Sequence, residues 1–211
     1  MARRRQKDPL RYAANLIGLC AAVCLGVTAL LRRGAGLLLR LFHEGATLEN
    51  PIAVPEWVLG VLNLLLPAAG TGAALWLMCM GLRGTPMRPR LSCKMPRDKQ
   101  LWLFLPVFLG AGFLGDLLAS LLGRLLAAWT RYRPPAALRL PQGGFALILY
   151  FIGGCAVPAV LEELLLRGAM QAALSRWGAW FSIVVSSVLF ALLHGALARM
   201  PSLVLLSVFL G

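Results

Sequence analysis

Two adjacent glutamates and an arginine stand in a strongly apolar stretch, VPAVLEELLLRG, from Val157 to Gly168. Each charged side chain at the centre of a bilayer costs about 2.5–3.5 kcal/mol on insertion scales. Glu163 and Arg167 are four residues apart, so they can form an ion pair along one face of a helix. Glu162 points about 100° away from that face, so its partner is sought on another element. A carboxylate in such surroundings suits general acid–base chemistry.

A histidine in a second apolar stretch, SSVLFALLHG, is the candidate partner of Glu162. This residue is His194, and Phe190 precedes it by one helical turn. If Gly178 is the turn between two antiparallel helices, Glu162 precedes the turn by the same length of chain by which His194 follows it. At 1.5 Å per residue both lie about 24 Å from the turn, so their side chains can meet. Such a pair can activate water or supply two ligands to a metal ion.

The same residues allow a purely structural interpretation, in which a Glu–Arg pair and a nearby histidine lock two helices together. The metal is also unknown at this point. One histidine and two carboxylates are a small ligand set for zinc, and the HExxH motif is absent from the sequence. The sequence therefore leaves open whether the protein uses a divalent ion such as Zn²⁺ as a cofactor. A serine protease is disfavoured because the sequence contains no Gly-x-Ser-x-Gly motif.

The composition indicates that these residues belong to a membrane protein. Apolar residues make up 59% of the 211 residues, charged residues only 14%, and the mean hydropathy is +0.77. A soluble domain carries about a quarter charged residues. Apolar runs of about 20 residues recur, which is the length that a helix needs to cross a bilayer. We expect an integral, multi-pass protein of the cell membrane with an all-α fold, a bundle of about five full spans and a partial sixth.

Breaker residues delimit the expected helices. The expected spans are residues 12–31, 56–82, 100–129, 144–177 and 179–198, followed by an apolar run from Pro201. Gly34 and Gly36 are expected to end the first helix, which leaves residues 37–42 as a weaker segment at the membrane interface. Pro158 is expected to loosen the fourth helix one turn before Glu162.

The net charge of +13 is concentrated in two regions, the N-terminus up to residue 11 and residues 83–99. In a membrane protein such basic segments keep their loops on the cytoplasmic side and contact anionic lipids. We therefore expect the lipid bilayer as a partner and no binding of nucleic acid.

Other polar residues in the apolar runs are assigned to packing. Asp116 and Arg124 are eight residues apart, too far for a direct pair on one helix. Thr71 and three serines are expected to make helix–helix contacts. The serines are Ser182, Ser186 and Ser187. Cys20 and Cys24 share a helix face and behave as small hydrophobic residues.

The two charged stretches resemble the motifs of a known family. EELLLRG, from Glu162, resembles an EExxxR motif, and FALLH, ending at His194, resembles an FxxxH motif. Both are similar to the CPBP group of intramembrane metalloproteases, also called the ABI or CAAX-protease family. The resemblance implies that Glu162 and His194 activate a water that attacks a peptide carbonyl. It implies that Glu163 belongs to the catalytic group, that Arg167 supports it and that Phe190 packs beside it.

The resemblance covers the chain from the GGCAVP stretch, which begins at Gly153, to its end. We therefore divide the chain into N-terminal helices and basic loops, 1–140, and a catalytic core, 141–211. The family's later HxxxN or HxxxD motif is missing, since no histidine follows His194. The run from Pro201 spans only about 16 Å, half the hydrocarbon core. We therefore expect the core to be incomplete and the chain truncated at Gly211.

Two functions are compatible with this pattern. The first is an intramembrane endopeptidase that cleaves a peptide or protein substrate at the membrane. The alternative is a non-catalytic scaffold or bacteriocin-immunity-type protein on the same fold. A transporter is disfavoured because the sequence contains no second matching half.

Overall fold

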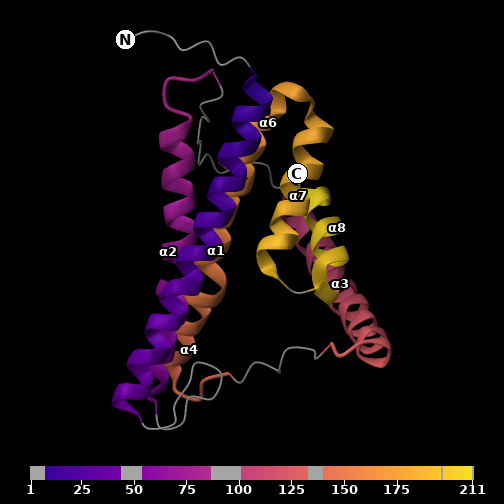
Figure 1. Cartoon of the computed structure of the whole chain (residues 1–211). Helices are drawn as coiled ribbons and strands as arrows, with labels where there is room; N and C mark the ends of the chain where they lie inside the picture. The colour runs from indigo at the N-terminus through magenta and orange to yellow at the C-terminus, as the bar shows by residue number, and fades with distance from the viewer. Residues whose placement is uncertain (1–7, 44–53, 87–100, 133–139, 196, 211) are drawn as a thin grey trace. The chain divides into compact units, whose positions relative to one another are not determined.

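The computed structural model describes residues 8–43, 54–86, 101–132, 140–195 and 197–210. Every regular element among these residues is a helix (Figure 1), which confirms the all-α class. Four helices are long and apolar enough to cross a membrane, and two shorter apolar helices follow. The four are Pro9–Phe42, Glu56–Gly81, Leu109–Trp129 and Gly144–Trp177. The protein is therefore an integral membrane protein. The basic clusters at residues 3–7 and 88–99 lie outside the described residues.

The first helix, α1 (Pro9–Phe42), is longer than the sequence predicts. Gly34 and Gly36 do not end it, so the expected break and separate interfacial segment are wrong. A glycine inside a helix costs about 1 kcal/mol relative to alanine, which tertiary packing can offset. Here Ala35 and Leu39 are both buried, so the segment around the glycines has a packed face.

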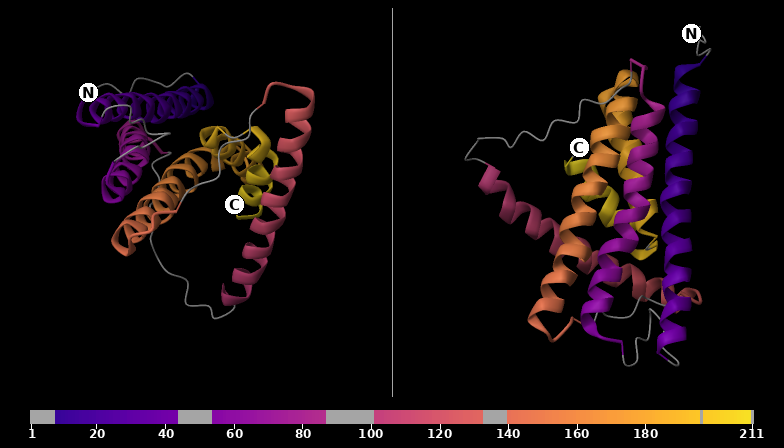
Figure 2. Two further views of the ribbon diagram at one scale, coloured as in Figure 1. Left: turned by 90° about the horizontal axis from the view of Figure 1, so that it is seen from below. Right: turned by 90° about the vertical axis from the view of Figure 1, so that its left-hand side faces the viewer.

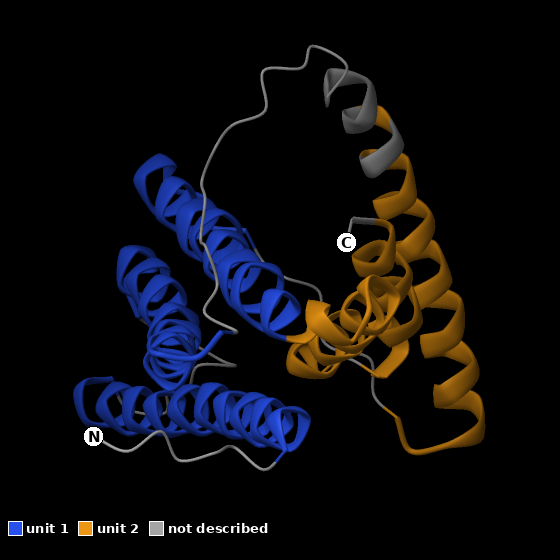
Figure 3. Cartoon of the chain, turned by 90° about the horizontal axis from the view of Figure 1, so that it is seen from above, with its two compact units in different colours: residues 1–89, 138–173 blue, residues 90–137, 174–211 orange. Residues whose placement is uncertain are grey.

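The described chain forms two compact units (Figure 3). Unit 1 consists of Met1–Pro89 and Leu138–Ala173, and unit 2 consists of Arg90–Ala137 and Leu174–Gly211.

In unit 1, helix α2 (Glu56–Gly81) packs antiparallel against α1. The Tyr12 hydroxyl near the start of α1 donates a hydrogen bond to the Gly81 carbonyl at the end of α2, at 2.8 Å. In the middle, Gly70 allows close approach, since a Cβ there would lie 2.8 Å from the Cys24 carbonyl oxygen. Small residues at such crossings are typical of membrane helices.

The third helix of unit 1 begins at Gly144 and changes its winding along its length. Its segments are α4 (Gly144–Phe151), η1 (Ile152–Ala156), α5 (Val157–Glu162), η2 (Glu163–Gln171), α6 (Ala172–Leu174) and the 3₁₀ turn η3 (Ser175–Trp177), of which η3 belongs to unit 2. Both η1 and η2 are π-helical. Pro158 has no N–H to donate, and the Val157 N–H bonds the Ile152 carbonyl five residues back. The expected loosening near Pro158 therefore takes the form of π-helical turns.

The π-helical segment η2 also corrects one assumption about Glu162. The expected depth of about 24 Å from Gly178 assumed 1.5 Å per residue throughout. The residues of η2, which follow Glu162 directly, are instead π-helical, with more residues in each turn and a smaller rise. The rise along this stretch is therefore not that of a uniform α-helix.

Helix α2 runs parallel to the helix that begins at Gly144 (Figure 2), and two contacts set their register. At the start of both helices, the Glu56 carboxylate accepts hydrogen bonds from the backbone N–H groups of Gln142 and Gly143, at 3.0 to 3.2 Å. These N–H groups precede the helix, so Glu56 acts as its N-terminal cap from another element. Further along, Gly153 lies against the backbone of Leu64.

Replacement of Gly153 by alanine is expected to destabilise unit 1. A Cβ at Gly153 would lie 2.7 Å from the backbone N and Cα of Leu64, so the helices must separate. Overpacking of this kind costs about 1–3 kcal/mol. Thermal unfolding in detergent measures it, with Gly72→Ala as the control because nothing lies within 4 Å of that position. Equal midpoints for the two variants would show that the close approach is not needed.

Unit 2 holds α3 (Leu101–Trp129), α7 (Ala179–His194), η4 (Leu197–Arg199) and α8 (Met200–Leu210). Gly178, with φ 122° and ψ 141°, breaks the chain before α7 as the sequence predicts. Helix α7 ends at His194 and not at residue 198, because Gly195 adopts φ 64° in the left-handed region and terminates the helix. The fifth helix is therefore shorter than expected for a full span.

Candidate active site

The acidic motif lies in unit 1, where the α-helical α5 meets the π-helical η2. Glu162 is the last residue of α5 and Glu163 the first of η2. The Arg167 Nη1 donates to both Glu163 carboxylate oxygens, at 2.6 and 2.7 Å. The predicted i,i+4 pair is therefore present. Its arginine side chain is 21% exposed and its glutamate side chain 50% exposed.

Glu162 is partly buried, and its segment α5 packs against α2. The Glu162 carboxylate lies within electrostatic range of the Cys24 thiol of α1. Cys24 Sγ lies 4.0 Å from the Thr71 hydroxyl of α2, and Thr71 donates its own proton to the Pro67 carbonyl at 3.0 Å. The thiol must therefore be the donor in the contact with Thr71. Thr71 joins two helices as the sequence predicts.

Sequence reasoning did not connect Cys24 with the acidic motif. Cys24 belongs to the first helix of the chain and Glu162 to a helix far along the sequence, and only the packing of α1 brings them together. No local spacing signals such a contact.

His194 lies in unit 2 at the C-terminal end of α7. Its Nδ1 lies 2.9 Å from the Phe190 carbonyl oxygen, and the two rings pack in a tilted arrangement, with 4.4 Å between centroids and an interplanar angle of 54°. A carbonyl only accepts hydrogen bonds, so Nδ1 carries the proton. In the neutral ring Nε2 then holds a lone pair, as a general base or a metal ligand requires. Phe190 packs beside His194, as the resemblance implies.

The two motifs fall in different units. Glu162, Glu163 and Arg167 form one group, and Phe190 and His194 form the other. The pairing of Glu162 with His194 stays a prediction. Within the described residues, no three His, Cys, Asp or Glu side chains gather as metal ligands.

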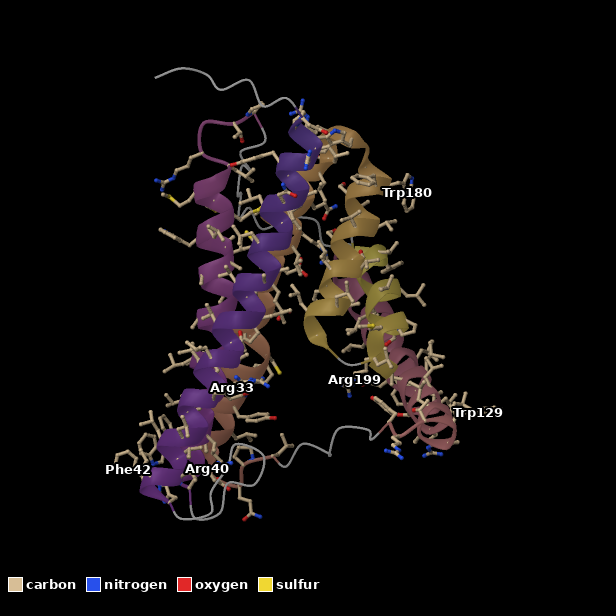
Figure 4. The ribbon with its side chains drawn as sticks, in the orientation of Figure 1. Arg33, Arg40, Phe42, Trp129, Trp180 and Arg199 are labelled. Carbon is tan, nitrogen blue, oxygen red and sulfur yellow. The ribbon has the colours of Figure 1, made fainter. Side chains whose placement is uncertain are left out.

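Unit 2 contains an ionic contact of its own, between α3 and the turn after α7. Arg199 Nη2 lies 3.7 Å from Asp116 Oδ1, and both side chains are more than half exposed (Figure 4 labels Arg199). The contact between Asp116 and Arg199 was not predicted from the sequence. A lone cation in an apolar run was the available signal, since Arg199 is the only Lys, Arg, Asp or Glu between Arg176 and Gly211.

A comparison with known families matches the part of the chain that holds both motifs. Residues 144–211 match the family model described as type II CAAX prenyl endopeptidase Rce1-like. Over these residues the chain is similar to the CPBP, or CAAX-protease, family. The CAAX-protease match contains all five residues of the two motifs. No curated protein and no solved structure matches the chain.

The CPBP family is a family of proteases, so the match supports a hydrolase activity for this protein. The division into residues 1–140 and a catalytic core of 141–211 is a division by function and stays a prediction. The same holds for the roles of the individual site residues.

Removal of one partner of the Glu163–Arg167 pair tests whether the pair is needed as a unit. Arg167→Leu leaves the Glu163 charge without this ion pair in an apolar segment. We expect the folded protein to lose at most about 3 kcal/mol of stability, which is the cost of placing one charge in the membrane. The added change Glu163→Gln should restore most of the folded protein, as measured by the fraction recovered from membranes in a monodisperse peak. A double variant that recovers no better than Arg167→Leu would contradict the pair as a charge-balanced unit.

Proposed function

We propose that this protein is an intramembrane endopeptidase of the CPBP type, which cleaves a peptide bond in a membrane-associated peptide or protein. The observation that supports this most is the family match over residues 144–211, which includes both charged motifs. The contact between His194 Nδ1 and the Phe190 carbonyl adds to it, because this contact favours the tautomer in which Nε2 is the basic nitrogen.

In the proposed reaction, Glu162 acts as the general base. Its carboxylate takes a proton from a water molecule, while the Nε2 of His194 accepts a hydrogen bond and orients that water. The water oxygen attacks the substrate carbonyl carbon and forms a tetrahedral intermediate. The C–N bond then breaks, and the proton on Glu162 passes to the leaving amine. Glu163, bound by Arg167, holds a second carboxylate next to the reacting one.

A divalent metal such as Zn²⁺ is part of the proposal as a cofactor. Carboxylate oxygens and a neutral imidazole nitrogen are ligand types that suit zinc, and His194 has the Nδ1–H to carbonyl bond typical of metal-binding histidines. If such an ion is bound, His194 Nε2 would bind it in place of the hydrogen bond to the water, and Glu162 would still act on that water. A bound zinc ion lowers the pKa of a coordinated water.

Cleavage of a lipid-anchored peptide by the full-length gene product in lipid vesicles tests the function. We expect a hydrolysis product with incorporation of one ¹⁸O from labelled water, detected by mass spectrometry. Vesicles that carry no protein are the control. Intact peptide after long incubation with well-folded protein would reject the enzyme and favour a non-catalytic scaffold or bacteriocin-immunity-type protein.

A further inference from the structure

The Asp116–Arg199 contact is an ionic pair within a largely apolar part of unit 2. Arg199 ends the short turn η4 and precedes α8, and Leu197–Phe209 is an apolar helical segment. Arg199 is 58% exposed, and Asp116 is 73% exposed. Exposed pairs contribute little to stability, while charges in apolar segments are costly. The pair is therefore poorly explained as a structural brace.

The geometry leaves the arginine able to bind another anion. At 3.7 Å, the contact with Asp116 is too long for a hydrogen bond, so it uses none of the five guanidinium N–H donors. The carboxylate still holds the positive group on one side. The backbone is also held, because the Ser202 hydroxyl donates to the Arg199 carbonyl at 2.9 Å. Ser202 packs against Gly115, because a Cβ added at Gly115 would lie only 3.2 Å from the Cβ of Ser202.

Arg199 also lies a short distance along the chain from His194. Arg199 is the fifth residue after the histidine, which is at most about 18 Å if the chain is extended. The path is shorter than this, because Gly195 turns in the left-handed region and Leu197–Arg199 is a 3₁₀ turn. The backbones of Arg199 and His194 are therefore less than about 18 Å apart, a separation that a short peptide bound at both side chains can span.

This separation can be compared with the length of a C-a-a-X tail, the substrate class that the family description names. A C-a-a-X tail has three residues after its modified cysteine, so its terminal carboxylate lies about 10 Å from that cysteine when extended. In an apolar site this carboxylate needs a cationic partner. The planar guanidinium of an arginine matches a carboxylate with two parallel hydrogen bonds.

We propose that Arg199 determines specificity by binding the C-terminal carboxylate of the peptide substrate, and that Asp116 positions the guanidinium for it. This inference rests on the proposed endopeptidase function. Arg199 binds the C-terminal end of the substrate, which lies a few residues from the bond that is cleaved. It takes no part in proton transfer.

Two matched peptides test the inference with the full-length gene product in vesicles. Both are lipid-modified and end in the same Cys-a-a-X sequence, but one ends in a carboxylate and the other in an amide. Arg199→Gln is expected to raise KM for the carboxylate peptide about 10–100-fold, the effect of one hydrogen bond to a charged group. Its KM for the amide peptide and both kcat values should stay those of the unchanged protein.

Two further variants separate specificity from folding. Arg199→Lys keeps the charge but loses the planar fork, so it should recover part of the carboxylate preference. Asp116→Asn should raise KM for the carboxylate peptide by a smaller factor and spare the amide peptide. Equal losses for the two peptides, or no change in either, would overturn the proposal. Peptide binding is measured beside cleavage, so a preference for the carboxylate without cleavage would reject only the endopeptidase function.

Discussion

Replacement of Glu162 by glutamine is expected to slow peptide cleavage by about 10²–10⁴-fold, the usual contribution of a general base. Glutamine keeps the size of the side chain and removes its ability to take a proton. Because the expected loss is in proton transfer, kcat should fall while KM changes little. Single-turnover cleavage of the vesicle-bound peptide measures the step directly.

Asp8→Asn is the matched control for this variant. Asp8 is also a carboxylate, but it lies at the N-terminus of α1, where it accepts a hydrogen bond from the Arg11 backbone N–H. We expect this variant to cleave at the normal rate. Cleavage by Glu162→Gln within a factor of a few of the unchanged protein would remove Glu162 from the catalytic group.

Replacement of His194 by alanine is expected to cause a loss of similar size, and the double variant with Glu162→Gln is expected to lose little more. Two residues that act on one water form a functional unit, so their effects are strongly non-additive. The cycle therefore asks whether Glu162 of unit 1 and His194 of unit 2 serve the same reaction. Rates of the four proteins are measured on one peptide.

Additive effects in this cycle would contradict the shared water. If each single variant loses a thousandfold and the double variant loses a millionfold, the residues act independently. Phe190→Leu serves as a milder comparison, since it removes the ring that packs against His194 but keeps the carbonyl that binds Nδ1. It should reduce the rate less than His194→Ala.

Several features were predictable from the sequence because their causes are local. The Glu163–Arg167 ion pair follows from i,i+4 spacing on a helix. The break at Gly178 follows from a glycine between two apolar runs. The long apolar helices follow from the length of the runs, which hold few charges.

The incorrect expectations share one cause, which is that packing competes with local propensity. Gly34 and Gly36 signal a helix end, yet α1 continues because Leu39 has a buried position to fill. In the other direction, Gly195 ends α7 one turn early because its backbone adopts a left-handed conformation. Composition around each glycine does not distinguish these outcomes.

The amino-acid sequence was sufficient to establish the membrane class, the two charged motifs and the residues that could carry the chemistry. These depend on hydropathy, on spacing within one helix and on family resemblance. Only the folded chain showed that Glu56 caps the helix that begins at Gly144, that Cys24 lies within electrostatic range of Glu162, and that Asp116 faces Arg199. Each of these contacts joins helices that are far apart in the sequence, and such contacts arise from the packing of whole helices, which no local spacing specifies.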